Sequence, residues 1–259
     1  MQAVEGNADA VIFDLEDGVV PDLKKSARKS VADFLSTQGA GWVRINDVTT
    51  EFWSSDLDAL RGSIGLGGVI LSKCESPEQV EATAERLGGK VPVIALVESA
   101  LGVEHSYEIA SSASAVRLAF GSGDFRRDTG AGIEAHALAY ARGRLVVASR
   151  AAGIAAPIDG PTLSDQVDVL VEDLHITRSM GMSGKLCMRE IQTASVNREL
   201  CPSAADVAWA RETIEALGYD GARVRDGSDL PRLARARKIQ DLATVFAQFD
   251  YAESSVPVS

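Results

Sequence analysis

Short apolar runs alternate with amphipathic stretches along most of the chain. The runs are rich in Val, Ile and Ala, and they span residues 8–15, 41–45, 67–73, 91–97, 115–120, 154–159 and 184–188. Near-continuous apolar runs of this length are typical of strands that are buried on both faces, as in a parallel sheet. The pattern therefore predicts seven buried, parallel strands.

Helical periodicity fills most of the intervals between these runs. It covers residues 23–35, 76–87, 133–152 and 164–180. The last of these segments opens with Ser164, a favoured N-cap residue, and ends before Gly181. A strand followed by a helix, repeated along the chain, indicates βαβ units.

Polar residues gather just beyond the carboxyl ends of the predicted strands. They are Glu16, Asp17, Arg44, Asn46, Lys73, Glu75, Glu98, Asp124, Asp159 and Arg189. A (β/α)₈ barrel builds its active site at this rim, from several strands at once. A doubly wound sheet normally binds ligands at one switch point and carries a glycine-rich phosphate loop there. The pattern therefore favours an α/β fold of the TIM (β/α)₈-barrel type.

The number of predicted strands is seven, whereas a closed barrel of this type has eight. Residues 1–7 resemble the end of a helix that leads into the first run. Either the barrel lacks its first strand or is truncated there, or it is open or closed in a different way. Both explanations stay open.

The pattern changes near Pro202, where the strand-helix alternation stops. Residues 203–217 and 231–246 have helical periodicity, and an Arg- and Gly-rich stretch separates them. We expect a barrel domain over residues 1–201, a helical lid or oligomerisation segment over 202–250, and a disordered tail over 251–259.

Composition narrows the classes of partner. The formal charge of −11 disfavours nucleic acid and anionic membranes as partners. No apolar run approaches the ~20 residues of a membrane span, and the first residues do not resemble a signal peptide. The three cysteines have no C-x-x-C spacing, which indicates a reducing compartment. We expect a cytoplasmic protein.

Two carboxylates are the first candidates for chemistry. Glu98 directly follows the run 91–97, and Asp124 closely follows the run 115–120. Carboxylates from adjacent strands suit Mg²⁺, which takes one or two of them together with waters and substrate oxygens. The alternative is that each acid only caps a helix or lies in a solvated loop.

Other rim residues could bind a substrate. The planar guanidinium of Arg44 suits a carboxylate, although a salt bridge to Glu16 or Asp17 is the alternative. The acidic cluster Asp14-Leu15-Glu16-Asp17 could orient Arg44 or metal-bound waters, and the alternative is an acidic turn ahead of a helix. The segment Gly121-Ser122-Gly123 predicts a flexible turn, and Gly123 would let a ligand approach the backbone closely.

Covalent catalysis has little support in the sequence. No Ser-His-Asp or Cys-His arrangement is apparent, and Lys73 and Lys185 are the candidate Schiff-base lysines near strand ends.

Six blocks in order resemble one family. They are VIFDLEDGVVPDLKKSAR, VRIN, GVILSKCES, VIALVESALGV, RLAFGSGDFRRDTG and ASRAAGIAAPIDGP. Together they resemble the citrate lyase beta-subunit-like (HpcH/HpaI aldolase) family of acyl-CoA lyases, which have phosphoenolpyruvate/pyruvate-domain barrels. The resemblance covers nearly all of residues 8–239.

The resemblance implies roles for the matching residues. It implies that Glu98 and Asp124 bind Mg²⁺, that Arg44 grips the carboxylate of a 2-keto acid, and that Glu16 and Asp17 support the site. The segment DGSDLPRLARA resembles the family's C-terminal stretch. There Asp229 would be the acid/base and would act at a neighbouring subunit of a trimer or hexamer.

Three departures from the family pattern affect the thioester half of the site, and one of them is that the stretch before Asp229 is about two residues shorter than in the family. The family's first strand has no counterpart, which agrees with the independent strand count. Arg189 and Glu190 stand where the family has His-Pro, while Lys185 and Gln192 persist.

The expected activity is Mg²⁺-dependent cleavage or condensation of a 3-hydroxy-acid thioester, such as citryl-, malyl- or citramalyl-CoA, giving acetyl-CoA and a 2-keto acid. The thioester could be carried by coenzyme A or by a carrier protein. One alternative is a metal-dependent pyruvate or oxaloacetate aldolase that acts on free aldehydes. Another is a non-catalytic binding or assembly subunit on the same fold.

Overall fold

A computed structural model of the chain describes residues 6–37 and 39–248. It divides into two compact units, Met1–Thr193 and Ala194–Ser259. The predicted boundary after residue 201 stays a prediction, and the predicted tail, 251–259, lies outside the described residues.

The first unit contains one sheet of seven parallel strands, each paired with the next in chain order. The strands are β1 (Ile12–Asp14), β2 (Gly41–Ile45), β3 (Leu66–Leu71), β4 (Val93–Val97), β5 (Ala115–Phe120), β6 (Ala155–Asp159) and β7 (Gly184–Lys185). All seven predicted strands are therefore confirmed, although β1 and β7 are shorter than their apolar runs.

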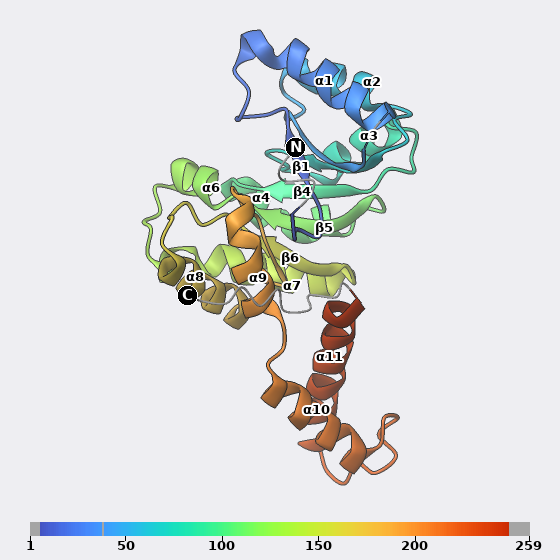
Figure 1. Cartoon of the computed structure of the whole chain (residues 1–259), viewed down its shortest axis with the longest axis vertical. Helices are drawn as coiled ribbons and strands as arrows, with labels where there is room; N and C mark the ends of the chain where they lie inside the picture. The colour runs from blue at the N-terminus through green and yellow to red at the C-terminus, as the bar shows by residue number, and fades with distance from the viewer. Residues whose placement is uncertain (1–5, 38, 249–259) are drawn as a thin grey trace, which may run out of the picture. The chain divides into compact units, whose positions relative to one another are not determined.

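The sheet curls into a half-barrel, part of which is visible in Figure 1. Over residues 6–37 and 39–248, no pairing joins β7 back to β1. The predicted barrel is thus confirmed as a curled parallel sheet of seven strands.

Apolar side chains cover both faces of the sheet, which explains the continuous runs. On β4, Val93, Ala95 and Val97 belong to the large core between sheet and helices. The alternate residues Ile94 and Leu96 form a second cluster on the other, concave face with residues of β3 and β5. Successive side chains of a strand point to opposite faces, so Glu98 continues the concave set.

Helices follow the strands in turn. In the first unit they are α1 (Lys24–Thr37), α2 (Glu51–Leu60), α3 (Pro77–Arg86), α4 (Ala100–Glu104), α5 (Ser106–Ala110), α6 (Ser122–Thr129), α7 (Ala139–Ala152) and α8 (Val167–Ser179), with 3₁₀ turns at Pro21–Leu23, Ala135–Leu138 and Glu190–Gln192. Along the outer face α1 packs on α2, α2 on α3, α3 on α5 and α5 on α7.

Three local predictions are corrected. Helix α8 begins at Val167, because the Ser164 hydroxyl accepts the N–H of Gln166 in a turn before the helix. The segment predicted from residue 133 becomes helical in a 3₁₀ turn before α7. Gly121-Ser122-Gly123 is the start of α6, with Gly121 at its N-cap.

The second unit is a pair of helices, α10 (Ala204–Leu217) and α11 (Asp229–Gln248), preceded by α9 (Thr193–Leu200), which begins at the boundary. A reciprocal capping box between Ser203 and Asp206 starts α10. The guanidinium of Arg235 lies 5.0 Å from the centre of the Trp209 ring, which joins α11 to α10. Both predicted C-terminal helices are confirmed. No helix within the described part of the chain has the length and apolar composition of a membrane span.

Candidate active site

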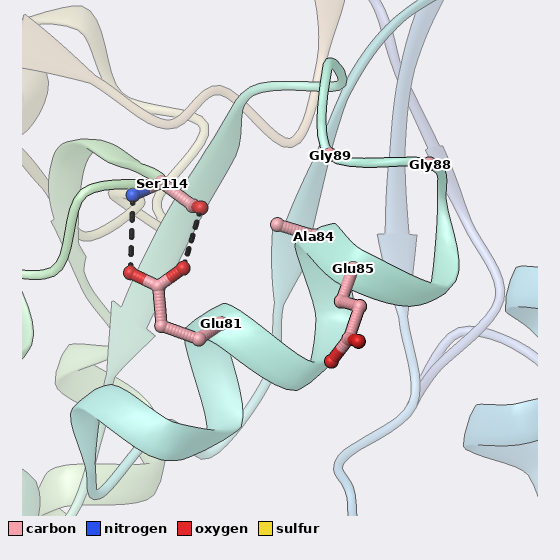
Figure 2. Close-up of a pocket in the computed structure, with 6 residues that line it drawn as sticks. All are labelled: Glu81, Ala84, Glu85, Gly88, Gly89 and Ser114. Atoms are coloured by element: carbon pink, nitrogen blue, oxygen red, sulfur yellow. Dashed lines mark hydrogen bonds between the residues drawn. The ribbon is translucent and has the colours of Figure 1, made fainter.

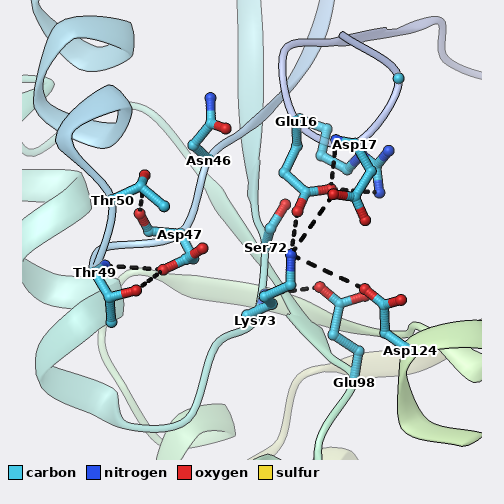
Figure 3. A network of polar contacts seen from close by, with 12 residues as sticks. Glu16, Asp17, Asn46, Asp47, Thr49, Thr50, Ser72, Lys73, Glu98 and Asp124 are labelled. Atoms are coloured by element: carbon cyan, nitrogen blue, oxygen red, sulfur yellow. Dashed lines mark hydrogen bonds and ion pairs between the residues drawn. The ribbon is translucent and has the colours of Figure 1, made fainter. Parts of the chain in front are cut away.

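The carboxyl ends of β1, β3, β4 and β5 bring charged side chains together at one rim of the sheet (Figure 3). The central residues are Glu16, Lys73, Glu98 and Asp124, each located at or just beyond the end of its strand. These four of the predicted rim residues therefore lie together in the structure.

Glu98 is buried at the end of β4, with an exposed fraction of 4%. Its Oε1 accepts the backbone N–H of Lys73 at 2.8 Å. Burial raises the pKa of Glu98 to about 7; the N–H of Lys73 opposes this, and the negative charges of Asp124 and Glu16 add to it. The ionised form of Glu98 would thus be stabilised by a nearby cation.

Asp124 lies in the first turn of α6, where the positive end of the helix dipole favours a carboxylate. Figure 3 shows the carboxylate groups of Asp124 and Glu98 pointing toward one another. Arg127, one turn later on α6, lies 3.2 Å from Oδ1 of Asp124.

The two carboxylates fit a Mg²⁺ ion. Among the described residues no group of three or more His, Cys, Asp or Glu side chains converges as a metal site. A pair of carboxylates is nevertheless what Mg²⁺ commonly uses, because waters and substrate oxygens complete its octahedron. The repulsion of Glu98 by Asp124, part of the cause of the raised pKa of Glu98, is what a divalent cation would relieve.

The absence of a side chain at Gly121 makes room for Glu98. A Cβ built on Gly121 would lie 2.2 Å from Oε2 and 2.4 Å from Cβ of Glu98. A Cβ on Gly123 would meet nothing within 4 Å, so the space beside that residue is open. Gly121 fixes the glutamate, and Gly123 leaves room for a ligand near the backbone.

Arg44 forms a two-pronged ion pair with Asp14. The two residues are register partners on β2 and β1. Nε of Arg44 donates to Oδ1 of Asp14 at 2.8 Å and Nη2 to Oδ2 at 2.5 Å, while Nη1 lies 3.1 Å from Oε2 of Glu16. The alternative of a salt bridge is thus correct for Glu16 and wrong for Asp17, and Asp14 is the principal partner.

The pKa values of Asp14 and Arg44 are shifted in the directions that keep both groups charged. Burial opposes the charged forms, but the hydrogen bonds and opposite charges outweigh it. They lower the pKa of Asp14 and raise that of Arg44.

The backbone at Glu16 is held in place by a buried lysine, Lys24. Nζ of Lys24 donates to the carbonyl oxygens of Leu15 and Glu16, at 2.8 Å each, and to Oδ1 of Asn46 at 2.7 Å. This fixes the loop after β1. The side chain of Asp17, which follows Glu16 in that loop, is 56% exposed.

The ammonium group of Lys73 lies among three carboxylates. Its Nζ is hydrogen-bonded to Oε1 of Glu16 and lies 3.9 Å from Oδ1 of Asp17 and 4.0 Å from Oδ2 of Asp124. Burial alone would lower the pKa of Lys73, but the hydrogen bond to Glu16 and the negative charges of Glu16, Asp17 and Glu98 raise it. A Schiff-base lysine needs a lowered pKa, so this role is disfavoured.

Lys185 is buried in a separate network beneath the ends of β6 and β7. Its Nζ donates to Oδ2 of Asp159 at 3.2 Å and to Oδ2 of Asp173 at 2.6 Å. Nε of Arg142 donates to Oδ1 of Asp159 at 2.9 Å. With its side chain fully buried and paired, Lys185 is structural. Arg189 is ion-paired with Asp165 instead of projecting into the acidic cluster.

Asp229 begins α11 in the second unit, where it is buried. Its Oδ2 accepts the backbone N–H of Arg225 at 3.1 Å, and its Oδ1 pairs with Arg232 at 3.3 Å. Its role as acid/base stays a prediction.

A hollow of about 620 Å³ lies away from this rim (Figure 2). Gly88, Gly89 and Ser114 line it, and they precede β4 and β5, so it lies at the opposite ends of the strands. The carboxylate of Glu81 in this hollow already accepts hydrogen bonds from Ser112 and Ser114. Barrel enzymes bind at the carboxyl ends of the strands, so we assign no function to the hollow.

Sequence reasoning missed Lys24, which supports the loop after β1, and also Arg127. The signal for Arg127 is its spacing, three residues after Asp124, which places the two side chains together only if the segment is helical. The prediction of a turn over residues 121–123 hid this relationship.

The comparisons with known proteins agree with this geometry. The profile of the HpcH/HpaI aldolase/citrate lyase family matches residues 2–189, and that of the HpcH/HpaI aldolase C-terminal domain matches residues 205–247. The chain belongs to the HpcH/HpaI aldolase/citrate lyase family.

Individual relatives of this family are similar over most of their length. The citrate lyase subunit beta-like protein of Deinococcus radiodurans is 30% identical, with 89% of this chain and 88% of that protein aligned. Human mitochondrial citramalyl-CoA lyase is 30% identical over 92% of this chain and 79% of that protein.

A solved structure shares the fold as well. Protein CitE of Mycobacterium tuberculosis, in complex with magnesium, acetoacetate and coenzyme A, matches with a TM-score of 0.77 and 30% identity over 92% of this chain and 91% of that chain. As a member of the HpcH/HpaI aldolase/citrate lyase family, the chain is an enzyme, a carbon–carbon lyase of the citrate lyase beta-subunit-like type.

Proposed function

We propose that this lyase cleaves, or in reverse forms, a 3-hydroxy-acid thioester such as citryl-, malyl- or citramalyl-CoA, giving acetyl-CoA and a 2-keto acid, and that Glu98 and Asp124 hold the Mg²⁺ it needs. The observation that carries the proposal is the pair of neighbouring carboxylates, one buried with its pKa raised to about 7, at the rim where barrel enzymes react. The magnesium and coenzyme A bound to protein CitE support it.

The bound ion would supply electrostatic stabilisation for negative charge on the substrate oxygens. The chain's own contribution is to fix its ligands. Glu98 is held by the N–H of Lys73 and confined by the backbone at Gly121, and Asp124 is anchored in the first turn of α6. Such preorganised groups act without rearranging during the reaction.

Arg44 would orient the carboxylate of the keto-acid portion. Asp14 and Glu16 hold its guanidinium at the rim, and its side chain keeps 25% exposure. Of five guanidinium N–H groups two go to Asp14, so donors remain on Nη1 and Nη2 for a substrate.

A proton must reach the carbanion-like carbon of the departing acetyl group. We propose Asp229 as the donor, acting at a neighbouring subunit of a trimer or hexamer. Light scattering of the purified protein tests the assembly, and a monomer would contradict this assignment.

Substitution of the metal ligands tests the function. In Glu98→Gln and Asp124→Asn, we expect release of acetyl-CoA from malyl- or citramalyl-CoA to fall by about 10²–10³-fold. The matched control is Asp58→Asn, which neutralises an exposed acid of α2 paired with Arg86. Full Mg²⁺-dependent activity in either ligand variant would remove the metal assignment.

The alternative activity, that of a pyruvate or oxaloacetate aldolase acting on free aldehydes, can be distinguished from the proposed one by comparing substrates. Faster turnover of 4-hydroxy-2-keto acids than of acyl-CoA thioesters by the wild-type enzyme would favour that activity instead.

A further inference from the structure

We infer that Lys73 is a built-in cation that holds the carboxylates of the metal site together before a divalent ion binds, and that it limits the affinity of the site for that ion. This inference deepens the proposed function and rests on the metal site of Glu98 and Asp124.

Lys73 uses both its main chain and its side chain for this purpose. Its N–H donates to Glu98 at 2.8 Å, and its ammonium is hydrogen-bonded to Glu16 and lies 4.0 Å from Asp124. One residue thus contacts both predicted metal ligands and an acid of a third strand. The side chain is 32% exposed, so its charge is only partly screened by water.

The backbone at Lys73 is in an uncommon conformation. Its φ is 49°, and among the residues that the structure describes it is the one non-glycine residue with a positive φ. A left-handed conformation is unfavourable for a non-glycine residue and persists only where its surroundings impose it. Here it places the amide of Lys73 at Glu98 while the side chain reaches Glu16.

The neighbouring cations cannot replace it. Arg127 reaches Asp124, but its side chain is 68% exposed and the structure gives it no contact with Glu16 or Glu98. Arg44 is ion-paired with Asp14 and Glu16, and no ion pair joins it to Asp124 among the described residues. Lys73 is therefore the cation closest to the centre of the acidic cluster.

The effect on metal binding follows from Coulomb's law. A divalent ion on Glu98 and Asp124 would lie near the Lys73 ammonium, and like charges at such distances repel appreciably in a partly buried site. Without that ammonium, the carboxylates would repel one another more strongly in the metal-free protein, and an incoming cation would relieve more repulsion. Loss of the charge should therefore tighten metal binding and destabilise the metal-free protein.

The test uses two neutral variants of the full chain, Lys73→Met and Lys73→Gly. Methionine keeps most of the side-chain volume, and glycine suits the left-handed backbone, so the second variant protects against misfolding of the first. Lys73→Arg keeps the charge, and Lys90→Met removes an exposed lysine elsewhere, with the same change in net charge. Calorimetric titration of Mg²⁺ into chelator-treated protein at pH 8, without substrate, gives the affinity. Thermal unfolding with and without Mg²⁺ gives the stability.

We expect the neutral variants to bind Mg²⁺ about tenfold or more tightly than the wild type. They should unfold at a lower temperature without metal and gain more from saturating Mg²⁺. Lys73→Arg and Lys90→Met should resemble the wild type. A lysine that served only the fold would lower stability without tightening the metal.

The outcomes separate the two proposals. Metal binding by the wild type, with equal or weaker binding in both neutral variants, would overturn the role of Lys73 alone. Absence of metal binding in the wild type would overturn the metal site, and the role of Lys73 with it.

Discussion

Asp14 and Arg44 face each other in register across β1 and β2, and the guanidinium of Arg44 binds both carboxylate oxygens of Asp14. The pair fixes the plane of the guanidinium at the rim, where Glu16 contacts its third nitrogen. A flexible lysine ammonium could not be held in one orientation by the same contacts.

Arg44→Lys should therefore lower kcat/KM for the thioester by about 30–100-fold, which corresponds to about 2–3 kcal/mol for one charge-assisted, bidentate contact. Steady-state kinetics measures the change. The control is Arg86→Lys, which alters an exposed ion pair with Asp58. Unchanged kinetics in Arg44→Lys would contradict the substrate-binding role.

Gly121 and Gly123 provide a matched pair of substitutions. Gly121→Ala places a methyl group against Glu98 and should weaken Mg²⁺ binding by about 10–100-fold, the size of effect seen when residues that orient metal ligands are changed. Gly123→Ala enters open space and should leave Mg²⁺ affinity unchanged, while the KM for substrate rises if the ligand approaches this backbone. Equal Mg²⁺ affinity in the two variants, by calorimetry, would show that Gly121 does not position Glu98.

Glu98 should make the metal-free protein less stable as the pH rises. Burial, with the charges of Asp124 and Glu16, raises its pKa from 4.5 to about 7, so its contribution to stability is complete below pH 4.5 and is lost as the pH rises through 7. The wild type should lose this stability between pH 4.5 and 8, whereas Glu98→Gln, which has no ionisable group at this position, should not. The free energy of unfolding of the variant should therefore rise relative to that of the wild type by up to about 3 kcal/mol over this range. Urea unfolding in the presence of a chelator measures this. A difference that does not vary with pH would refute the prediction.

The same ionisation should control metal binding. A carboxylate ligand must lose its proton to bind a metal, so the affinity for Mg²⁺ should fall by about tenfold per pH unit below pH 7. Calorimetry at pH 6, 7 and 8 would show it. A constant affinity over this range would mean that Glu98 is already ionised at pH 6.

Lys185 should be necessary for the stability of the first unit. Lys185→Met leaves the buried Asp159 with Arg142 as its remaining cation and should lower the free energy of unfolding by about 3 kcal/mol. Lys29→Met, which breaks an exposed pair with Asp33, should cost less than about 0.5 kcal/mol. Equal losses in the two variants, measured by urea unfolding, would contradict this view of the network.

The sequence predicts the parts of the site that depend on strand order. Glu98 and Asp124 follow consecutive parallel strands, whose carboxyl ends meet at one rim, so their proximity follows from the apolar runs alone. The pair of Asp14 and Arg44 additionally needs the register between two strands that a helix separates, which no local pattern encodes.

Two other features depend on backbone geometry that their residues do not announce. Lysine is not a residue that indicates a left-handed conformation, so the position of the Lys73 amide could not be foreseen. Gly121 and Gly123 favour a turn by composition, yet the segment continues as α6 and brings Arg127 to Asp124.

The margins of the half-barrel are formed by its shortest strands, three residues in β1 and two in β7. A short edge offers few backbone N–H and C=O groups to an extended segment of another molecule. The two edges of the curled sheet therefore offer few sites at which strands of other molecules could pair, which disfavours edge-to-edge association into fibrils.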